Sequence, residues 1–290
     1  MNLVDIILFA ALIVACPIGI YVFAGTRVTW DGIKDRLDRY RYHVLIILAV
    51  GAMKSGLLYV EERTESYATD YTPMMHGFEG NWVFWVQHHL ESGAMTVFMA
   101  VIYLGSFLFI MVFSMALLCY MDERKAASKL GFLYLVLFFI TVPFYLFVIV
   151  YVPSYPKMFY PGAATIVPGM EPLLYNISPR VNDFFMHYDS FNNCFPSLHI
   201  GYPVAVLLSL AINVRGFRGY KWFLAVLTVL ISVSILYLGI HWLTDIIGGF
   251  LIAAVGVVIT ERYARRFWKW VHRIDLWTRK RLPFWPFKSS

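Results

Sequence analysis

Two short polar segments interrupt an otherwise apolar chain, and each carries a histidine. The first, residues 194–199 with the sequence CFPSLH, places His199 two residues after Ser197. Proline and serine suit the first turn of a helix. Because a helix N-terminus presents N–H groups and a partial positive charge, it attracts phosphate. This segment therefore predicts a phosphate-binding helix start that carries His199.

The second segment, residues 241–245 with the sequence HWLTD, pairs His241 with Asp245 at i, i+4 spacing. On a helix this spacing puts both side chains on one face. A carboxylate there can accept the Nδ1 proton of His241, which leaves Nε2 free and more basic, as in an activated nucleophile. Glycines flank the pair at Gly239, Gly248 and Gly249 and permit close helix packing.

Either segment alone would be weak evidence for a site. A lone histidine near a membrane interface is usually only amphipathic, and an HxxxD spacing is common by chance. The two together are rarer, because each lies at the start of an apolar segment and charge counting places both on the same side of the membrane. Ionisable groups at such positions are functional candidates when they face a bundle interior.

The elements that must position these residues are membrane helices. Of the 290 residues, 60% are hydrophobic and 14% are charged, whereas soluble domains average about 25% charged residues. The net charge of +6 needs no nucleic acid to explain it. The three cysteines have no paired spacing that would indicate a disulfide framework or a zinc site.

The apolar runs divide the chain into seven segments, and each must be helical because lipid offers no partner for backbone N–H and C=O groups. We therefore expect an all-α, polytopic membrane helix bundle with about seven transmembrane helices. The predicted spans are residues 4–24, 43–60, 94–120, 130–152, 198–213, 222–240 and 243–260.

Basic residues fall on alternate loops. The three loops that follow spans one, three and five, together with the C-terminal tail, hold 20 of the 24 lysines and arginines. The opposite side holds only Arg63, Lys157 and Arg180, and Lys54 lies inside the second span. Because basic loops stay in the cytoplasm, we predict an N-out, C-in topology with both histidine segments on the outer side.

The same pattern suggests three regions. Residues 1–60 form the first two spans, and residues 61–260 form the core that carries the chemistry. That core includes two long outer loops, 61–93 and 153–197, and loops of this length are often functional. Residues 261–290 combine basic and aromatic side chains, which favours a helix lying on the anionic inner leaflet.

The two segments together resemble the type 2 phosphatidic-acid phosphatase superfamily, whose usual motifs are KxxxxxxRP, PSGH and SRxxxxxHxxxD. The form PSLH, with Tyr237-Leu238-Gly239 before the second histidine, looks more like the inositol phosphorylceramide synthase branch. The resemblance covers spans three to seven, roughly two thirds of the chain. The residues that match the second and third motifs are Pro196, Ser197, His199, Ser234, His241 and Asp245.

The resemblance implies a role for each residue. His241 would attack phosphorus and form a phosphohistidine, and His199 would protonate the leaving alcohol. Asp245 would orient His241, while Ser197 and neighbouring backbone N–H groups would hold the phosphate oxygens. The resemblance implies no metal and no cofactor.

The chain departs from the family pattern in its cations. Ile235 stands where the third motif usually has arginine, and no KxxxxxxRP motif exists. A dianionic phosphate monoester would normally need two or three cations around its developing charge. Fewer cations suit a phosphodiester, a diphosphate or a transfer to an alcohol. We expect Lys157 and Arg180 to contact phosphate, with solvated loop charges as the alternative.

These observations predict an integral membrane enzyme, of the cell membrane, that acts on a lipid phosphate at the non-cytoplasmic face. Transfer of the phosphate-bearing headgroup, with an alcohol as the possible acceptor, is favoured slightly over hydrolysis of the lipid phosphate. The alternatives are a non-catalytic lipid-binding or transport protein, and a relative that has lost activity. A separation above about 10 Å between His199 and His241 would favour the non-catalytic protein, because both must flank one phosphorus atom.

Overall fold

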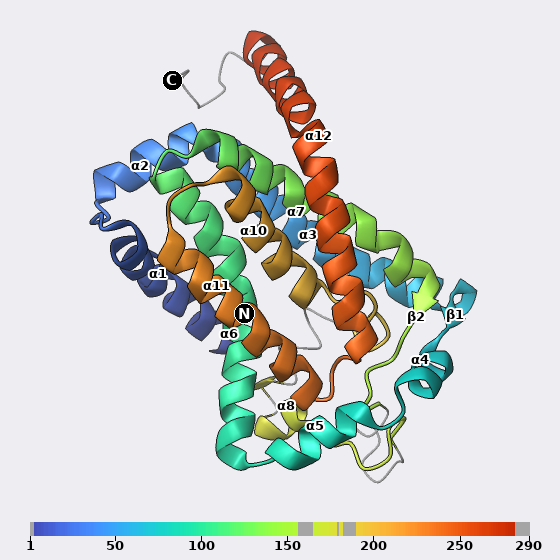
Figure 1. The fold of residues 1–290 in the computed structure, drawn as a ribbon. Coiled ribbons are helices and arrows are strands. Elements are labelled where there is room, and N and C mark those ends of the chain that lie inside the picture. Colours follow the sequence, from blue (N-terminus) through green and yellow to red (C-terminus); the bar gives the residue numbers. More distant parts are fainter. Residues whose placement is uncertain (1–2, 156–164, 179, 182–189, 282–290) are drawn as a thin grey trace.

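The computed structural model describes residues 3–155, 165–178, 180–181 and 190–281. Most of these residues are helical (Figure 1). The longer helices are α1 (Leu3–Ala24), α2 (Trp30–Arg39), α3 (Arg41–Thr64), α6 (Gly93–Tyr120), α7 (Arg124–Phe147), α10 (Leu198–Asn213), α11 (Arg218–Tyr237) and α12 (Leu243–Arg281). The short elements are η1 (Glu65–Tyr67), α4 (Thr72–Glu79), α5 (Trp82–Leu90), α8 (Leu173–Ile177), β1 (Thr69–Asp70) and β2 (Val148–Ile149).

Six of the described helices are long and apolar enough to cross a membrane, namely α1, α3, α6, α7, α11 and α12. The protein is therefore an integral membrane protein, and the predicted all-α membrane bundle is confirmed. Helix α10 has 16 residues. At 1.5 Å per residue it is about 24 Å long, which is shorter than the roughly 30 Å hydrocarbon core of a bilayer.

The chain before α10 explains why this helix is short. Residues 191–194 run beside residues 150–152 instead of continuing α10 outward, and Val150 and Val152 donate backbone hydrogen bonds to Asn192 and Phe191 at 3.0 and 2.9 Å. The same pairing corrects the predicted fourth span, 130–152, because α7 ends at Phe147 and the following residues are extended. Among the described residues, the bundle thus contains six helices long enough to span a membrane and the shorter α10 at its centre.

Helix α10 is the centre of the bundle. It packs against α6, α7, α11 and α12, so that most of its side chains are buried. Helix α3 packs mainly on α7, and α1 packs mainly on α6. These two helices are largely exposed along their length, and in α1 only Asp5, Gly19 and Ile20 are buried. They therefore lie at the edge of the bundle rather than in its core.

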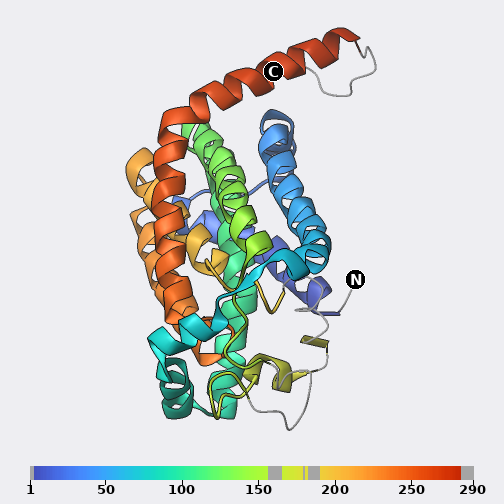
Figure 2. The ribbon, with the colours of Figure 1, turned by 90° about the vertical axis from the view of Figure 1, so that its right-hand side faces the viewer.

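The short elements gather at one end of the bundle. Figures 1 and 2 show α4, α5, α8 and both strands at this end, whereas α2 and the C-terminal part of α12 lie at the other. Strands β1 and β2 pair in parallel, with Thr69 opposite Val148 and Asp70 opposite Ile149. The described parts of the two predicted outer loops are thus brought together, next to the starts of α10 and α12.

Helix α12 joins the predicted seventh span to the described part of the C-terminal tail without a break. Figure 2 shows that it bends where it leaves the bundle. The Trp268 indole of α12 donates a hydrogen bond to the Ser128 carbonyl at 2.6 Å and stacks on His43 with ring centroids 4.3 Å apart. The contact of the tail with the inner leaflet stays a prediction, as does the N-out, C-in orientation.

Candidate active site

The two histidine segments meet where α10 and α12 begin. Ser197 is the N-cap of α10, and its backbone N–H donates to the Asp245 carbonyl at 3.1 Å. The two helices come so close here that a Cβ on Gly249 would lie 2.7 Å from the Ser197 carbonyl oxygen and 2.9 Å from Ile200 Cβ. A glycine is therefore needed at this position for the two segments to touch.

His241 and Asp245 form a buried pair. The Nδ1 atom of His241 lies 3.0 Å from Asp245 Oδ2, which also accepts the backbone N–H of Trp242 at 2.8 Å. His241 is 6% exposed and Asp245 is fully buried. The interpretation that both residues share one helical face is wrong, because α12 begins at Leu243 and His241 lies in the preceding turn. The carboxylate in the first turn of α12 reaches back to the histidine instead.

This arrangement decides which nitrogen of His241 can react. Because the carboxylate of Asp245 only accepts hydrogen bonds, Nδ1 carries the proton and Nε2 keeps its lone pair. Nε2 lies 3.3 Å from the hydroxyl oxygen of Ser197, which is also fully buried. The basic nitrogen is thus directed at the N-terminus of α10, where the first N–H groups of a helix have no acceptor within the helix.

His199 faces the same point from α10. Its ring centroid lies 5.8 Å from that of His241, well inside the separation of about 10 Å expected if both flank one phosphorus atom. On its other side, His199 packs between Tyr103 and Phe107 of α6, each with a ring-centroid distance of 4.7 Å. Tyr103 lies ten residues into α6, so the site is recessed by about 15 Å from the start of that helix.

The start of α12 is occupied by Glu79, the last residue of α4. Its carboxylate accepts the backbone N–H of Leu243 at 2.8 Å, and it also accepts the N–H and the hydroxyl of Thr244. A carboxylate there satisfies the unpaired N–H groups and neutralises the positive end of the helix. The start of α12 is therefore already occupied by a negative charge. The sequence gives no local signal for this contact, since Glu79 is one of several acidic residues in its loop.

The turn between α11 and α12 is held by its backbone. The Ile235 carbonyl accepts the N–H groups of Ile240 and His241 at 3.2 and 3.3 Å. Gly239 has a φ of +71°, and a Cβ there would lie 2.8 Å from Met170 Cε. The Ile235 side chain, which stands where the family motif has arginine, is fully buried in the core. It therefore contributes packing and no charge.

Gln87 of α5 fixes the neighbouring loop. Its side-chain amide donates to the carbonyls of Glu171 and Tyr237, both at 2.9 Å, and its oxygen accepts the N–H of Glu171 at 2.7 Å. Close by, the Trp242 indole donates to the Tyr151 carbonyl at 2.8 Å. Burial and the Glu65 carboxylate raise the pKa of Tyr151, so its hydroxyl stays protonated and donates to Glu65 at 2.8 Å. The end of α11 and the outer loops are thus fastened around His241.

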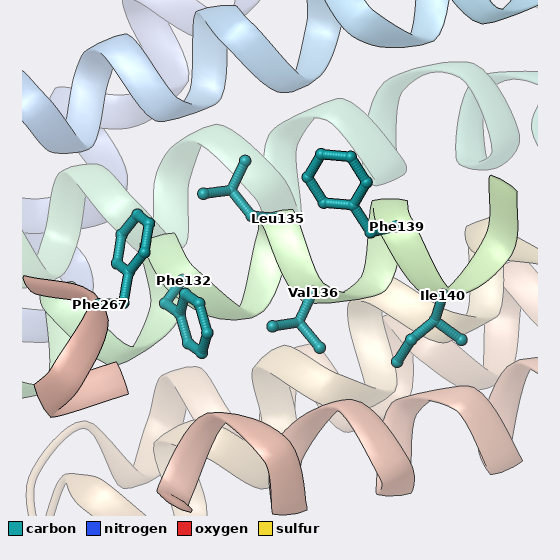
Figure 3. A pocket seen from close by; sticks show the side chains of 6 residues that line it. All are labelled: Phe132, Leu135, Val136, Phe139, Ile140 and Phe267. Carbon is teal, nitrogen blue, oxygen red and sulfur yellow. The ribbon is translucent and has the colours of Figure 1, made fainter. Parts of the chain in front are cut away.

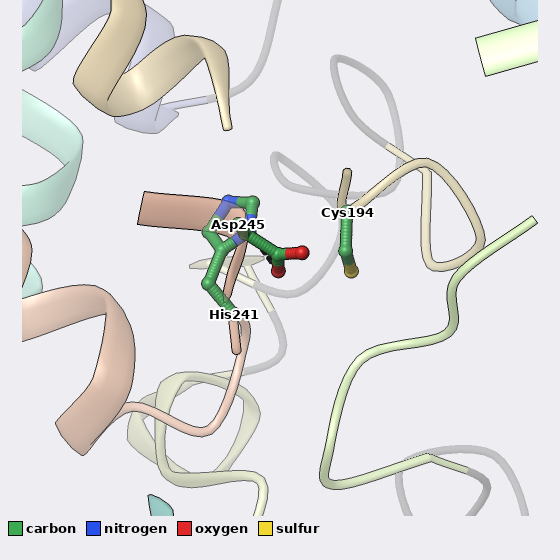
Figure 4. Close-up of side chains that lie close together, drawn as sticks. All are labelled: Cys194, His241 and Asp245. Atoms are coloured by element: carbon green, nitrogen blue, oxygen red, sulfur yellow. Dashed lines mark hydrogen bonds and ion pairs between the residues drawn. The ribbon is translucent and has the colours of Figure 1, made fainter. Parts of the chain in front are cut away.

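Cys194 lies beside the pair, as Figure 4 shows. Its thiol donates to the Ile240 carbonyl at 3.5 Å, and its sulfur, a His241 nitrogen and an Asp245 oxygen all lie within 4.8 Å of one another. This is the one group within the described ranges whose donor atoms could hold a metal ion. A metal there would have to replace the hydrogen bond between His241 and Asp245. The sequence did not single out Cys194, because no second cysteine or ligand motif accompanies it.

Arg180 and Lys157 are the two predicted phosphate contacts in the outer loop. Arg180 is exposed, and its backbone N–H donates to the Ser178 hydroxyl at 3.2 Å. Lys157 lies outside the described residues. Contact of either cation with a phosphate remains a prediction.

A cavity of about 540 Å³ leads to the two histidines. Its walls come from α1, α3, α6, α7 and α10, and they are mostly apolar, with His199 and His241 at one side. A second cavity, about 330 Å³ along α7, is lined only by Phe132, Leu135, Val136, Phe139, Ile140 and Phe267 (Figure 3). These six side chains offer no group that could react or bind an anion, so the chemistry belongs to the first cavity.

A comparison with protein families places the site in context. The model of a family described as the PAP2 superfamily matches residues 75–259, which is more than half of the chain and includes Ser197, His199, His241 and Asp245. No curated protein and no solved structure matches the chain.

Proposed function

This chain belongs to the PAP2 superfamily, and from that premise we propose that it is a membrane enzyme that moves a lipid-linked phosphate through a phosphohistidine at His241. Membership supports a phosphatase-type enzyme. The observation that carries the proposal is the buried pair of His241 and Asp245, with His199 at a ring-centroid distance of 5.8 Å. A nucleophile, its orienting carboxylate and a second histidine thus share one recess, as two-step phosphoryl transfer requires.

In the first step, Nε2 of His241 attacks phosphorus, and the bond between phosphorus and the leaving alcohol oxygen breaks. His199 gives its proton to that oxygen, so the alcohol leaves neutral. The Asp245 carboxylate accepts the Nδ1–H of His241, with 3.0 Å between Nδ1 and Oδ2. It stabilises the positive charge that the ring acquires. Ser197 and the N-terminus of α10 hold the phosphate oxygens, with Lys157 and Arg180 as further contacts from the loop.

In the second step, an oxygen nucleophile attacks phosphorus and the phosphorus–nitrogen bond breaks. His199, now neutral, takes the proton of the attacking hydroxyl, and His241 returns to its starting state. Water as nucleophile gives hydrolysis, and an alcohol gives transfer to a new headgroup. The step uses no metal, because the two histidines supply both the nucleophile and the proton transfer.

The buried Ile235 favours transfer slightly over hydrolysis. It removes the arginine that the family motif places beside the phosphate, and its side chain lies in the core. A phosphodiester or diphosphate carries less charge per phosphorus than a monoester, so it needs fewer cations. With the PSLH sequence, this supports a headgroup transferase like the inositol phosphorylceramide synthase branch. The reaction would occur at the non-cytoplasmic face of the cell membrane, with a lipid phosphate and possible alcohol acceptor as partners.

The test of the mechanism is the substitution His241→Ala. We expect it to abolish turnover of ³²P-labelled lipid phosphates and to abolish the acid-labile protein label trapped by rapid quenching. His272→Ala, which removes an exposed histidine near the end of α12, serves as the matched control and should keep both signals. Retained labelling in His241→Ala would mean that another residue is the nucleophile.

A second experiment separates the two reactions. Purified protein in lipid nanodiscs is incubated with a panel of lipid phosphates, with and without alcohols such as inositol. Free phosphate released in both conditions indicates a phosphatase, whereas a new lipid headgroup formed only with the alcohol indicates a transferase. Neither product from any substrate, with correctly folded protein, would contradict the proposed function.

A further inference from the structure

The cavity beside the histidines brings in a cation from an unexpected part of the chain. Lys54 lies on α3, which precedes the family match at residues 75–259. It lines the same cavity as His199 and His241. Among the described residues that line this cavity, Lys54 is the one lysine or arginine. A positive charge that Ile235 does not provide is therefore present in the wall of this cavity.

The position of Lys54 is fixed relative to the catalytic segment. Its Nζ is buried and lies 4.9 Å from the ring centroid of Tyr145, within the range of a cation–π contact. The Tyr145 hydroxyl donates to the Pro196 carbonyl at 3.0 Å, directly before Ser197. Two turns further along α3, Glu61 accepts a hydrogen bond from Asn193 at 3.0 Å. Helix α3 is thus held against the segment that ends in His199 directly through Glu61, and indirectly through Tyr145 of α7.

The rest of the cavity suits a hydrocarbon chain. Apolar side chains of α1, α3 and α6 form most of its wall, and its volume of about 540 Å³ is typical of small-molecule sites, which span roughly 300–1,000 Å³. Phe9 and Leu48 line it, and both remain more than half exposed on the bundle surface, at 55% and 63%. The cavity thus reaches the surface of α1 and α3 that faces lipid, and a membrane lipid could enter from the side.

An ionisable side chain within a membrane helix is costly, and such groups usually face a cavity or pathway that uses them. Lys54 shares the cavity with one carboxylate, Asp5 of α1, which is 5% exposed. Helices α1 and α3 contribute few residues to the core. Helices α1 and α3 cover this cavity, and α3 places Lys54 in it. The two helices therefore have a function beyond their small contribution to core packing.

We propose that Lys54 binds an anionic phosphate oxygen of the lipid substrate, whose hydrocarbon chain lies in the apolar part of the cavity between α1, α3 and α6. The inference rests on the proposed function and deepens it, since it names a binding residue outside the matched region. Lys54 is a substrate-binding group and takes no proton in the reaction. The structural alternative is that Lys54 only balances the charge of Asp5.

The kinetic test uses Lys54→Met, which keeps the unbranched apolar stem of the side chain and removes its charged end, and Lys54→Arg, which keeps the charge. We expect Lys54→Met to raise KM for the best lipid phosphate by at least about tenfold with kcat within threefold, because a uniform binding interaction acts on KM. Lys54→Arg should restore most of the affinity. Lys34→Met, at an exposed position of α2, is the matched control. An unchanged KM in Lys54→Met would overturn the proposal.

The double variant Asp5→Asn/Lys54→Met separates binding from charge balance. If Lys54 only pairs with Asp5, removing both charges should restore KM and thermal stability. If Lys54 binds phosphate, the double variant should remain as defective in KM as Lys54→Met. Recovery in the double variant would therefore overturn the proposal.

A binding measurement keeps this inference distinct from the proposed reaction. Photoactivatable dioleoyl phosphatidic acid is cross-linked to inactive His241→Ala protein, with unlabelled phosphatidic acid or dioleoylglycerol as competitor. We expect competition by the phosphatidic acid alone, and at least about tenfold weaker competition when Lys54→Met is added. Equal competition with and without Lys54 sinks this inference and leaves the reaction standing. An absence of turnover in the wild-type protein sinks the reaction, whatever the cross-linking shows.

Discussion

The substitution Asp245→Asn probes the centre of the site with the smallest change of shape. Asp245 Oδ2 accepts both the His241 Nδ1 proton at 3.0 Å and the Trp242 N–H at 2.8 Å, in a fully buried position. In the asparagine variant, an amide oxygen in the place of Oδ2 still accepts both hydrogen bonds, so Nδ1 keeps its proton and Nε2 keeps its lone pair. The negative charge is lost, so the variant no longer stabilises the positive charge that the ring acquires when Nε2 attacks.

The size of the effect follows from the same distance. Two unit charges 3.0 Å apart attract by about 5.5 kcal/mol at an effective dielectric constant of 20, which is an upper value for stabilising the charged ring. Hydrogen bonds to charged groups typically contribute about 1.5–3 kcal/mol net. Each 1.36 kcal/mol changes a rate about tenfold. On this basis we expect kcat to fall by about 10–10², and by no more than about 10⁴, with little change in KM.

The assay measures formation of the ³²P-labelled protein in a single turnover, followed by steady-state product release from the same lipid phosphate. Asp38→Asn, an exposed carboxylate of α2, is the matched control. Thermal unfolding of both variants confirms that the fold is retained. The reasoning fails if Asp245→Asn folds normally and its rate of labelling falls by less than tenfold, because the charge of the carboxylate would then not stabilise the reacting His241 ring.

Two other predictions test packing and metal dependence. Gly249→Ala should lower the free energy of unfolding by about 1–3 kcal/mol and reduce turnover, because its Cβ would lie 2.7 Å from the Ser197 carbonyl oxygen. Gly105→Ala, where a Cβ would meet nothing within 4 Å, is the control in thermal unfolding and activity assays, and equal behaviour of the two variants would contradict the packing argument. Incubation with EDTA should leave the rate within twofold of the untreated enzyme. A loss of activity in EDTA would contradict this if added Zn²⁺ recovers the activity and if Cys194→Ala abolishes the sensitivity to EDTA. That outcome would assign the group of Cys194, His241 and Asp245 to a metal.

The sequence by itself determined the class of fold and indicated the candidate reactive residues. Hydropathy is a local property, and lipid forces each apolar run to satisfy its backbone within the run. The helices over the predicted segments therefore follow from the sequence alone. Pro196 and Ser197 signal the start of α10 in the same local way, through backbone preference and capping. His241 and Asp245 are close enough in sequence that their contact could be expected without knowledge of the fold.

Tertiary structure decided what surrounds those residues. Residues 191–194 pair with residues 150–152 ahead of α10, a contact that no local pattern indicates. Glu79 contacts Leu243 at the start of α12, although the two residues are 164 positions apart in the sequence. Cys194 has no partner spacing in the sequence that would indicate a site, but the turn before α12 brings its thiol to Ile240 and the histidine pair.

Lys54 shows the division most clearly. The sequence indicates a lysine inside a span, which could face a bundle interior, pair with a carboxylate or reach the interface. Only the packing of α3 beside α7 and α1 beside α6 places it in the cavity with His199 and His241. Local preference fixes which segments are helical and where they begin. The contacts between segments depend on how all the helices pack at once, and those contacts decide which residues share the site.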